Sequence, residues 1–306
     1  MSPAAAPRLR GCTIALDVGG TFTDVTLLDP ATGRLWITKT PTTPRDPSEG
    51  FLVGVEKVLR IAGAHPGALG QVLHGTTTAT NAILEDKGAP TGLLTTAGFR
   101  YVLEIGRHDI PRRANMFAWV KPSRPVPPEL IFEIPGRIGV DGQELEPVTE
   151  GAVRAAARHL REAGVVSVAV CFLHSYANDT HERRAREVLL EEHPGCAVSL
   201  SSEVLPVFRE YERTMATVLN AYVQPLVGRY VERLEERLLS RGISAPLRIM
   251  KSNGGVVGAD VVRRQSIHTA LSGPAAGVVG ARLVGGAAGF EDLISVDVRG
   301  TRADVC

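Results

Sequence analysis

The chain has 306 residues, of which 44% are hydrophobic and 22% are charged, and its formal net charge is +1. This length supplies about two domains with sizeable cores, and the composition is ordinary for a globular protein. The small net charge excludes a general attraction to nucleic acid or to an anionic membrane, and no apolar run is long enough to span a bilayer. We therefore expect no nucleic acid and no membrane among the partners.

The N-terminal segment and the cysteines predict a cytoplasmic protein. Residues 1–10 lack the continuous apolar region of a secretion signal, and we expect them to be disordered. The four cysteines lie far apart without a Cys-x-x-Cys spacing, which indicates reduced thiols rather than zinc ligands.

Residues 14–28 predict a β-hairpin with polar groups at its tip. Apolar residues alternate along both arms, which places one face of each arm in a core. Glycines at the tip tolerate positive φ and leave no Cβ in the way of a ligand, and their amides combine with hydroxyls into a cluster that suits a phosphate. The expected phosphate-binding residues are Gly19, Gly20, Thr21 and Thr23. The alternative is an ordinary hairpin whose turn is rich in glycine.

Two aspartates flank this turn. Because a carboxylate repels phosphate, Asp17 is best interpreted as a ligand of Mg²⁺, either directly or through water. Asp24 lies on the other arm and is expected to steady the loop.

The following residues predict an α/β sheet. Residues 35–40 form a third strand, a helix begins near Ser48, a short strand covers residues 71–74, and a further strand covers residues 91–96. Three consecutive strands followed by alternating helices and strands are typical of this class.

The turn His74-Gly75-Thr76-Thr77, between a strand and a helix, is a second candidate site. Its hydroxyls and free amides at a helix N-terminus suit an anion or a substrate carbonyl. Helix capping by threonine explains the same residues without a ligand. His74 is either a general acid or base, or a donor to a backbone carbonyl.

The middle of the chain changes pattern twice. Prolines in residues 108–148 forbid a long helix, and the apolar run 165–172 is typical of a strand covered on both faces of a parallel sheet. Residues 205–220 and 225–241 then predict two helices. The apolar stripe of the second helix is interpreted as core packing. It consists of Leu226, Tyr230, Leu234 and Leu238.

A polar turn and a helix of small residues follow. The turn at residues 251–255 exposes amides and polar side chains, although by itself this pattern indicates only a turn. Its candidate binding residues are Ser252, Asn253 and Gly254. In the segment 269–280 that follows, Pro274 begins a helix of very small residues that another backbone can approach closely.

Residues 294–305 repeat the first hairpin, with Asp297 in the place of Asp17. The repeat predicts a second lobe built like the first, in which Gly300 and Thr301 belong to a second phosphate turn. Arg299 stands where the first glycine is expected, so this turn is altered. We expect the second lobe to be truncated at Cys306, and its exposed apolar strands to favour a homo-oligomer.

The string Asp17-Val18-Gly19-Gly20-Thr21-Phe22-Thr23-Asp24 resembles the first phosphate-binding loop of the actin, heat-shock chaperone and sugar-kinase superfamily. It is similar to the opening of the hydantoinase/5-oxoprolinase family, which includes ATP-dependent hydantoinases, 5-oxoprolinases and a subunit of acetone carboxylases. The turn at His74 with Thr80-Asn81-Ala82 resembles the second signature of that family, and the small-residue helix resembles the connecting helix of the superfamily.

The resemblance implies a ribonuclease-H-like, actin-type ATPase first lobe with an additional α/β domain and a truncated second lobe. It implies a hydantoinase/oxoprolinase N-terminal α/β domain over residues 11–200, with a proline-rich insertion at about 108–148. Residues 201–306 are then expected to be the start of the hydantoinase A domain, with its helices, its connecting helix and an incomplete second phosphate hairpin.

The resemblance also implies an ATP- and Mg²⁺-dependent hydrolase that opens a cyclic amide, such as a hydantoin, 5-oxoproline or a related lactam, by phosphorylation of the amide oxygen. Asp17 and Asp297 are the expected catalytic and metal-binding carboxylates, and His74 is a further catalytic candidate. The expected substrate-binding residues are Thr76, Thr77, Ser252, Asn253 and Gly254. A hydantoinase B-type subunit is a candidate partner.

Two other functions stay open. The chain is a non-catalytic, truncated remnant if the missing half of the cleft is essential, and the 306 residues alone are expected to be inactive. A small-molecule kinase shares the phosphate loop but leaves the His74 turn and the Ser252 turn unexplained.

Overall fold

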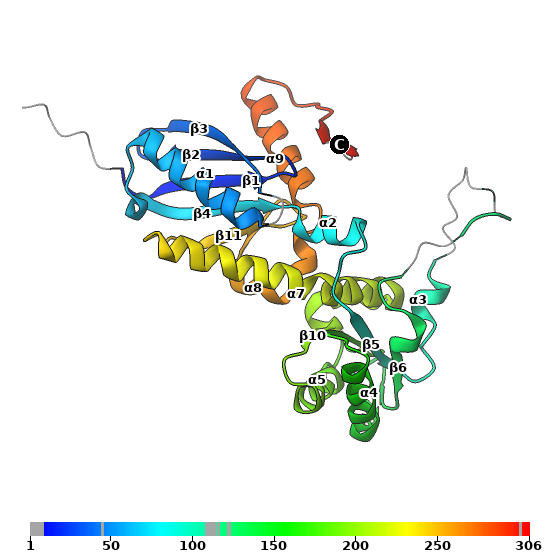
Figure 1. The fold of residues 1–306 in the computed structure, drawn as a ribbon. Coiled ribbons are helices and arrows are strands. Elements are labelled where there is room, and N and C mark those ends of the chain that lie inside the picture. Colours follow the sequence, from blue (N-terminus) through cyan, green and yellow to red (C-terminus); the bar gives the residue numbers. More distant parts are fainter. Residues whose placement is uncertain (1–8, 44–45, 108–114, 116, 121–123, 300–301) are drawn as a thin grey trace, which may run out of the picture. The chain divides into compact units, whose positions relative to one another are not determined.

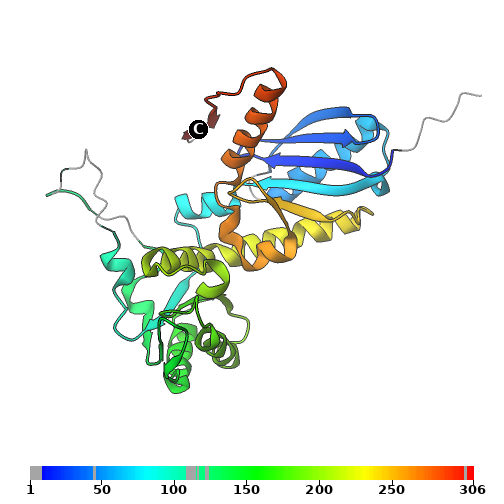
Figure 2. The ribbon, with the colours of Figure 1, turned by 180° about the vertical axis from the view of Figure 1, so that it is seen from behind.

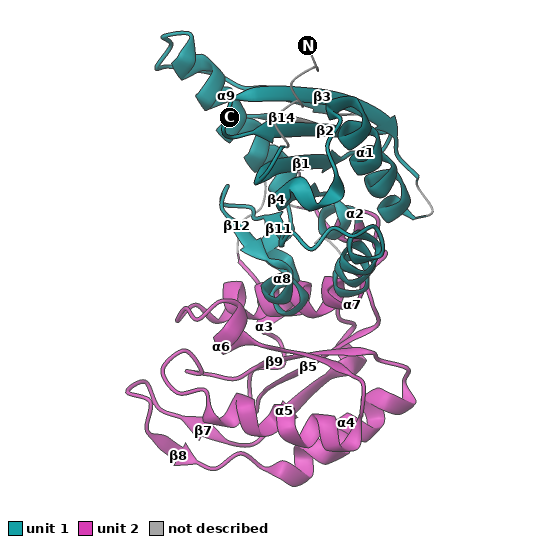
Figure 3. Cartoon of the chain, turned by 90° about the vertical axis from the view of Figure 1, so that its left-hand side faces the viewer, with its two compact units in different colours: residues 1–81, 227–306 teal, residues 82–226 magenta. Residues whose placement is uncertain are grey.

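The computed structural model describes residues 9–43, 46–107, 115, 117–120, 124–299 and 302–306. The chain forms two compact units, coloured separately in Figure 3. Unit 1 contains residues 1–81 and 227–306, and unit 2 contains residues 82–226. Unit 1 thus combines both ends of the chain, whereas the resemblance implies a division at residue 200, which stays a prediction. The disorder expected for residues 1–10 falls mostly outside the described residues.

Unit 1 is built on a six-stranded sheet with the order β12-β11-β4-β1-β2-β3. The first three strands are antiparallel neighbours, as the hairpin pattern predicts, and β4 and β11 continue the sheet in parallel with β1. The strands are β1 (Cys12–Val18), β2 (Phe22–Asp29), β3 (Arg34–Pro41), β4 (Leu69–Thr76), β11 (Leu247–Met250) and β12 (Val256–Gly258).

Helix α1 covers one face of this sheet, and helix α9 lies beside one end of its strands. Helix α1 contacts β1, β2 and β3, and α9 contacts β4 and β11. Figure 1 and Figure 2 show α9 beside the end of the sheet at which β4 leads into α2. The elements are α1 (Pro47–Ala62), η1 (Pro66–Ala68), α2 (Thr78–Leu84, which continues into unit 2), α8 (Ala259–Arg264), η3 (Ser266–Thr269) and α9 (Ser272–Ala287). A separate two-stranded sheet follows, made of β13 (Val296–Arg299) and β14 (Arg302–Val305).

The two faces of the unit 1 sheet differ in burial. In β1, Ile14, Leu16 and Val18 are buried, whereas Asp17 between them is exposed. The buried face packs against Phe51 and other apolar residues of α1, as the period of two in the strands and the helical period of α1 require. Helix α1 begins at Pro47, one residue before the expected Ser48, because the Asp46 side chain caps it by accepting a hydrogen bond from the Ser48 N–H.

Unit 2 contains a four-stranded parallel sheet with the order β10-β9-β5-β6. Strand β9 is central and buried throughout, which confirms the prediction from the apolar run 165–172. The residues 91–96 form β5 in this sheet instead of extending the first one, because β5 pairs with β6 and β9. The strands are β5 (Thr91–Thr96), β6 (Ile131–Ile134), β7 (Arg137–Ile138), β8 (Glu144–Glu146), β9 (Ser167–Cys171) and β10 (Ala197–Leu200). The helices are α3 (Val102–Ile105), η2 (Pro128–Leu130), α4 (Glu150–Glu162), α5 (Thr180–Glu192) and α6 (Ser201–Val204).

The expectation of two helices over residues 205–241 is wrong, because one helix, α7 (Glu210–Ser240), contains Pro225 in its interior. Proline removes one backbone hydrogen bond, yet Val223 before it and Val227 after it are fully buried. Packing on both sides of the proline therefore outweighs the local preference for a break. Both units combine sheets with helices, which confirms the predicted α/β class. No helix in the described ranges has both the length and the apolar character needed to cross a membrane.

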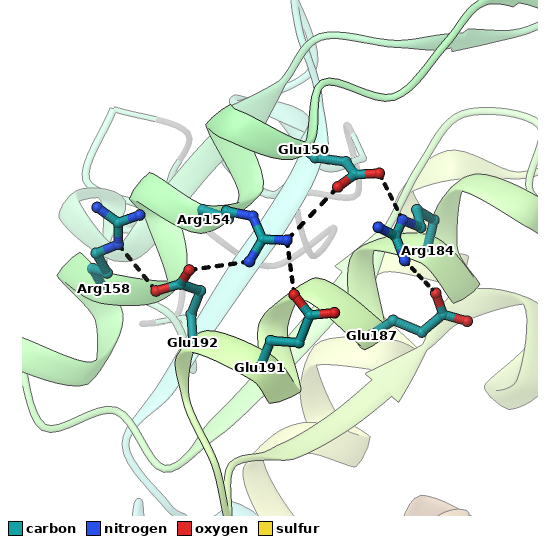
Figure 4. A network of polar contacts seen from close by, with 7 residues as sticks. All are labelled: Glu150, Arg154, Arg158, Arg184, Glu187, Glu191 and Glu192. Atoms are coloured by element: carbon teal, nitrogen blue, oxygen red, sulfur yellow. Dashed lines mark hydrogen bonds and ion pairs between the residues drawn. The ribbon is translucent and has the colours of Figure 1, made fainter.

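Salt bridges join α4 to α5 on the surface of unit 2 (Figure 4). The Arg154 guanidinium lies 2.7 Å from the Glu191 carboxylate and 3.1 Å from that of Glu192. Hydrogen bonds from Arg184 hold the pKa of Glu150 below its ordinary value, and those from Arg158 and Arg154 do the same for the pKa of Glu192. The network holds the two helices in register above the apolar core that they share with β9.

We expect acid and salt to weaken this network. The lowered carboxylate pKa values mean that the stabilisation is present above the ordinary carboxyl pKa and is lost as the pH falls through the folded-state value. Arg154→Ala should lower the melting temperature at pH 7 by a few degrees at most, and should reduce the effect of 1 M NaCl on it. Calorimetry at low and high salt tests this, with Arg229→Ala, an exposed arginine of α7, as the control. An unchanged salt effect in Arg154→Ala would contradict the expectation.

Two helical glycines allow a matched test of packing. A Cβ on Gly54 of α1 would lie 2.7 Å from the Cγ2 atom of Val25 in β2, whereas a Cβ on Gly228 of α7 would meet no atom within 4 Å. Gly54→Ala should therefore destabilise the protein by about 1–3 kcal/mol through overpacking. Gly228→Ala should stabilise it by about 0.5–1 kcal/mol, because alanine loses less conformational freedom in a helix. Urea unfolding measures the free energy of unfolding of both variants. Equal changes in the two variants would show that the packing of α1 does not depend on close approach to the sheet.

Candidate functional site

Three polar turns lie at the same edge of the unit 1 sheet. Strands β1, β4 and β11 are mutually parallel, so their carboxyl ends point the same way. The glycine turn follows β1, the His74 turn ends β4, and the turn at residues 251–255 follows β11. In open α/β sheets ligands bind at this edge. The structure thus collects, at one edge, the three motifs that the sequence singles out.

The glycine turn is shaped by backbone hydrogen bonds. The Gly19 N–H donates to the Phe22 carbonyl at 3.0 Å, and a Cβ on Gly19 would lie 3.1 Å from that oxygen. Gly20 is exposed, and no neighbouring atom lies within 4 Å of where its Cβ would be. Neither glycine uses the left-handed region. The expected positive φ is therefore not used here, and glycine is required at position 19 for close approach instead.

Thr42, which sequence reasoning missed, clamps the turn from the segment after β3. Its N–H donates to the Thr21 carbonyl at 2.9 Å, and its hydroxyl donates to the Gly19 carbonyl at 2.8 Å. The Thr23 hydroxyl is fully buried and lies 3.2 Å from that of Thr42, whereas Thr21 is exposed at the tip. Gly20 and Thr21 are accordingly the predicted phosphate-binding residues that face solvent, while Thr23 supports the turn.

Three carboxylates line one cavity of about 470 Å³ beside this turn. Asp17 and Asp24 are cross-strand partners in β1 and β2, and Asp297 comes from β13. The Lys39 ammonium lies 3.1 Å from the Asp24 carboxylate and offsets its charge. The rest of the lining consists of His74, Thr26 and small or apolar residues. The small or apolar residues include Ala15, Leu73, Gly75, Ala276 and Gly277.

Small residues bring the carboxylates close to the backbone. A Cβ on Gly75 would lie 3.4 Å from Asp17 Oδ1, and one on Gly277 would lie 3.8 Å from Asp297 Oδ2. Within the described ranges no group of three or more His, Cys, Asp and Glu side chains is arranged for a metal. Carboxylates from two strands facing one cavity fit Mg²⁺, which commonly takes one or two protein carboxylates and completes its shell with water and phosphate oxygens. Gly300 and Thr301, expected in the second phosphate turn, lie outside the described residues.

His74 lies on the opposite face of the sheet from Asp17. Its ring is 1% exposed and packs between Phe51 of α1 and Tyr230 of α7. Its Nε2 atom is 2.9 Å from the Tyr230 hydroxyl and its Nδ1 atom is 3.3 Å from the Leu16 carbonyl. Burial lowers the pKa of His74 to about 4, so the ring is neutral near pH 7. The hydrogen bond to a backbone carbonyl is the second of the two roles that the sequence leaves open for this residue.

The threonines of this turn make local hydrogen bonds. Thr76 is buried, and its hydroxyl accepts from the Thr78 N–H at the start of α2. The Thr77 hydroxyl accepts from Asn81. The Thr76 carbonyl accepts from the Ser272 hydroxyl at 3.0 Å, which ties β4 to the start of α9. Capping is therefore present, and a substrate role of Thr76 or Thr77 stays a prediction.

The turn after β11 is compact but open on its outer side. Ser252 and Asn253 are exposed, and the Asn253 side chain accepts from the Gly255 N–H. Gly254 requires glycine, because its φ is +82° and a Cβ would lie 3.0 Å from Val279 of α9. Two exposed polar side chains at the same edge as the glycine turn are available to a ligand, and their substrate role also stays a prediction.

The sequence matches two family descriptions. Residues 13–193 match "Hydantoinase/oxoprolinase N-terminal region", and residues 213–306 match "Hydantoinase/oxoprolinase". The alpha subunit of caprolactamase from Pseudomonas jessenii is 36% identical, over 95% of this chain and 42% of the relative. The gamma subunit of acetophenone carboxylase from Aromatoleum aromaticum is 34% identical, over 96% of this chain and 42% of the relative.

Solved structures give the same result. The crystal structure of the ATP-dependent caprolactamase from Pseudomonas jessenii superposes with a TM-score of 0.84 at 35% identity, covering 96% of this chain and 43% of the other. Nucleotide-free acetone carboxylase superposes with a TM-score of 0.87 at 27% identity, covering 97% and 44%. These likenesses confirm the predicted actin-like ATPase type of α/β fold. The chain spans less than half the length of these relatives.

The buried His74 makes stability depend on pH. The unfolded chain binds a proton with a pKa near 6.5 and the folded chain only near 4, so stability is complete above about pH 6.5 and declines as the pH falls towards about 4. Between pH 6.5 and pH 5 the loss should be about 2 kcal/mol. His74→Asn should be less stable at pH 7 but should lack this decline.

Urea unfolding at a series of pH values measures the effect. His159→Asn, which replaces an exposed histidine of α4, should keep the decline. A wild-type protein that is equally stable at pH 7 and pH 5 would contradict the neutral, buried state of His74.

Proposed function

Because this chain belongs to the hydantoinase/oxoprolinase family, we propose that it forms part of an enzyme that uses ATP and Mg²⁺ to open a cyclic amide such as a lactam. The observation that supports this most is the pair of carboxylates, Asp17 and Asp297, which line one cavity beside an exposed glycine turn. The caprolactamase relative, which is named as ATP-dependent, supports a lactam as the substrate class.

The chemistry of an amide explains the need for ATP. Amide resonance makes the carbonyl carbon a poor electrophile. Bound MgATP would supply a phosphoryl group to the amide oxygen and so convert that oxygen into a leaving group. The protein then has to position the reactants and balance charge, since such transfer requires little covalent participation by side chains.

Each part of the site has a proposed role. Asp17 and Asp297 hold Mg²⁺, partly through water, and the exposed Gly20 amide and Thr21 hydroxyl contact phosphate oxygens. Asp24, paired with Lys39, steadies the hairpin. Ser252, Asn253, Gly75 and Thr77 are proposed to face the substrate, and the buried Thr76 is proposed to hold their turn in place. His74 also lines the cavity, but both of its ring nitrogens are hydrogen-bonded inside the core, so we propose that it supports the edge of the sheet instead of transferring protons.

A carboxylase subunit is a second candidate function. The fold superposes on acetone carboxylase as well as on caprolactamase, with TM-scores of 0.87 and 0.84. In that case the same site would transfer a phosphoryl group to the enol oxygen of a ketone, with the α-proton passing to a base. The O–P bond would break again when the α carbon bonds to the carboxyl carbon, and the oxygen would stay in the product. Phosphate release with a lactam panel, compared with release in the presence of ketones and bicarbonate, separates the two substrate classes.

A partner subunit and a cytoplasmic location belong to this proposal. The caprolactamase and carboxylase relatives are named as subunits, which supports a hydantoinase B-type partner for this chain. Free thiols such as those of Cys12, Cys171, Cys196 and Cys306 remain reduced in the cytoplasm. Homo-oligomers through β13 and β14 stay a prediction.

Calorimetry with MgATP tests the nucleotide site directly. The wild-type chain should bind MgATP, and Asp17→Asn and Asp297→Asn should each weaken binding by about tenfold or more, because each removes a charged contact with the cation. Asp260→Asn, an exposed carboxylate of α8 that does not line the cavity, should leave the affinity unchanged. Absence of MgATP binding, or binding that is indifferent to both cavity aspartates, would refute the proposed site.

A further inference from the structure

Two neighbouring residue pairs in β1 and β4 face opposite sides of the sheet. Leu16 is opposite His74, and Asp17 is opposite Gly75 in the next register position. The side chains of the first pair are buried on the side of α1, and all four residues contribute to the lining of the cavity. Successive residues of a strand are covalently linked and point to opposite faces of the sheet. A contact that fixes the position of Leu16 relative to His74 therefore also fixes the position of Asp17 relative to Gly75.

The hydrogen bonds of His74 assign its tautomer. The Leu16 carbonyl can only accept, so Nδ1 must carry the proton in the bond of 3.3 Å. In the neutral ring Nε2 then has no proton and accepts from the Tyr230 hydroxyl, at 2.9 Å. The Tyr230 hydroxyl therefore selects the form of His74 that holds β1 through Leu16.

Tyr230 also reaches the end of β4. Its hydroxyl donates to His74, two residues before Thr76, and burial raises the pKa of the phenol, which keeps it protonated and able to donate. Thr76 caps α2 through Thr78, and its carbonyl accepts from Ser272 at the start of α9. One hydroxyl, from a helix with no residue at the cavity, thus holds the middle one of the three cavity-lining residues of β4.

We propose that Tyr230 is a positioning residue of the sheet edge that carries the glycine turn: its hydroxyl orients His74 and thereby fixes Asp17 and Gly75 at the cavity. The functional part of this proposal rests on the proposed nucleotide site. Its structural part is that one hydrogen-bond donor on α7 sets the register and the rigidity of β1 and β4 at their carboxyl ends. The apolar stripe of α7 supplies the packing around Tyr230, and the hydroxyl supplies the orientation.

Tyr230→Phe removes the hydroxyl and keeps the ring that packs against His74. We expect the variant to bind MgATP about fivefold to tenfold more weakly. This decrease corresponds to the loss of one buried hydrogen bond. Tyr101→Phe, which removes an exposed tyrosine hydroxyl from unit 2, should bind like the wild type. A purely structural role would lower the melting temperature of Tyr230→Phe and leave the affinity of the folded protein unchanged, which would overturn the proposal.

Two measurements without nucleotide decide the proposal independently. Nitrogen NMR of the wild-type chain should show His74 with its proton on Nδ1. Amide exchange in Tyr230→Phe should be at least about tenfold faster at residues 16–20 and 74–78 than in the wild type, while exchange in the unit 2 sheet stays unchanged. A proton on Nε2, or unaltered exchange at both segments, would overturn the proposal.

The outcomes separate this proposal from the proposed function. If the wild-type chain does not bind MgATP, the proposed function fails, and NMR and exchange alone judge the role of Tyr230. If the wild type binds and Tyr230→Phe binds equally well, the function stands and the positioning role is wrong. Should Tyr230→Phe prove too unstable to measure, the position of the His74 ring proton in the wild-type chain still decides, because a proton on Nε2 would overturn the positioning role.

Discussion

The parallel pairing of β1, β4 and β11 is the constraint on which the candidate site depends. It aligns the carboxyl ends of three strands that are far apart in the sequence, so that the turns after them share one edge. The alternation along β1 and β4 then separates two tasks. The side chains of Leu16, His74 and Thr76 are buried, whereas Asp17, which alternates with Leu16 along β1, is exposed at the cavity. The same strands therefore carry both the core and the proposed chemistry, and Leu16 and His74 contribute to both.

The first hairpin was predictable because its information is local. Apolar alternation fixes which residues of β1 and β2 are buried, and the glycines can only be placed at the turn. The strand pairing of β4 with β11 was not predictable in the same way, since the four residues Leu247–Met250, three of them apolar, fit many sheets. Likewise, residues 91–96 have the pattern of a strand, but only long-range packing assigns them to the sheet of unit 2.

Helix α7 and the site residues show where local rules are outweighed. Pro225 favours a break, yet the buried residues on both of its sides keep one helix of 31 residues. The motif around His74 correctly marks an edge of the sheet, but the sequence does not reveal on which face the ring lies. Thr42 and Lys39, which brace the glycine turn and Asp24, carry no motif at all. Their contribution comes from strand register, which a single sequence does not encode in a recognisable pattern.

The small sheet of β13 and β14 has a thermodynamic consequence for any cation bound near Asp297. A two-stranded ribbon is only marginally stable in water, and Val296 and Val298 on it are 62% and 74% exposed. A cation held between Asp17 and Asp297 would therefore have to order this ribbon as it binds. Part of the favourable free energy of coordination would be offset by lost chain entropy, so affinity at this site is coupled to local folding.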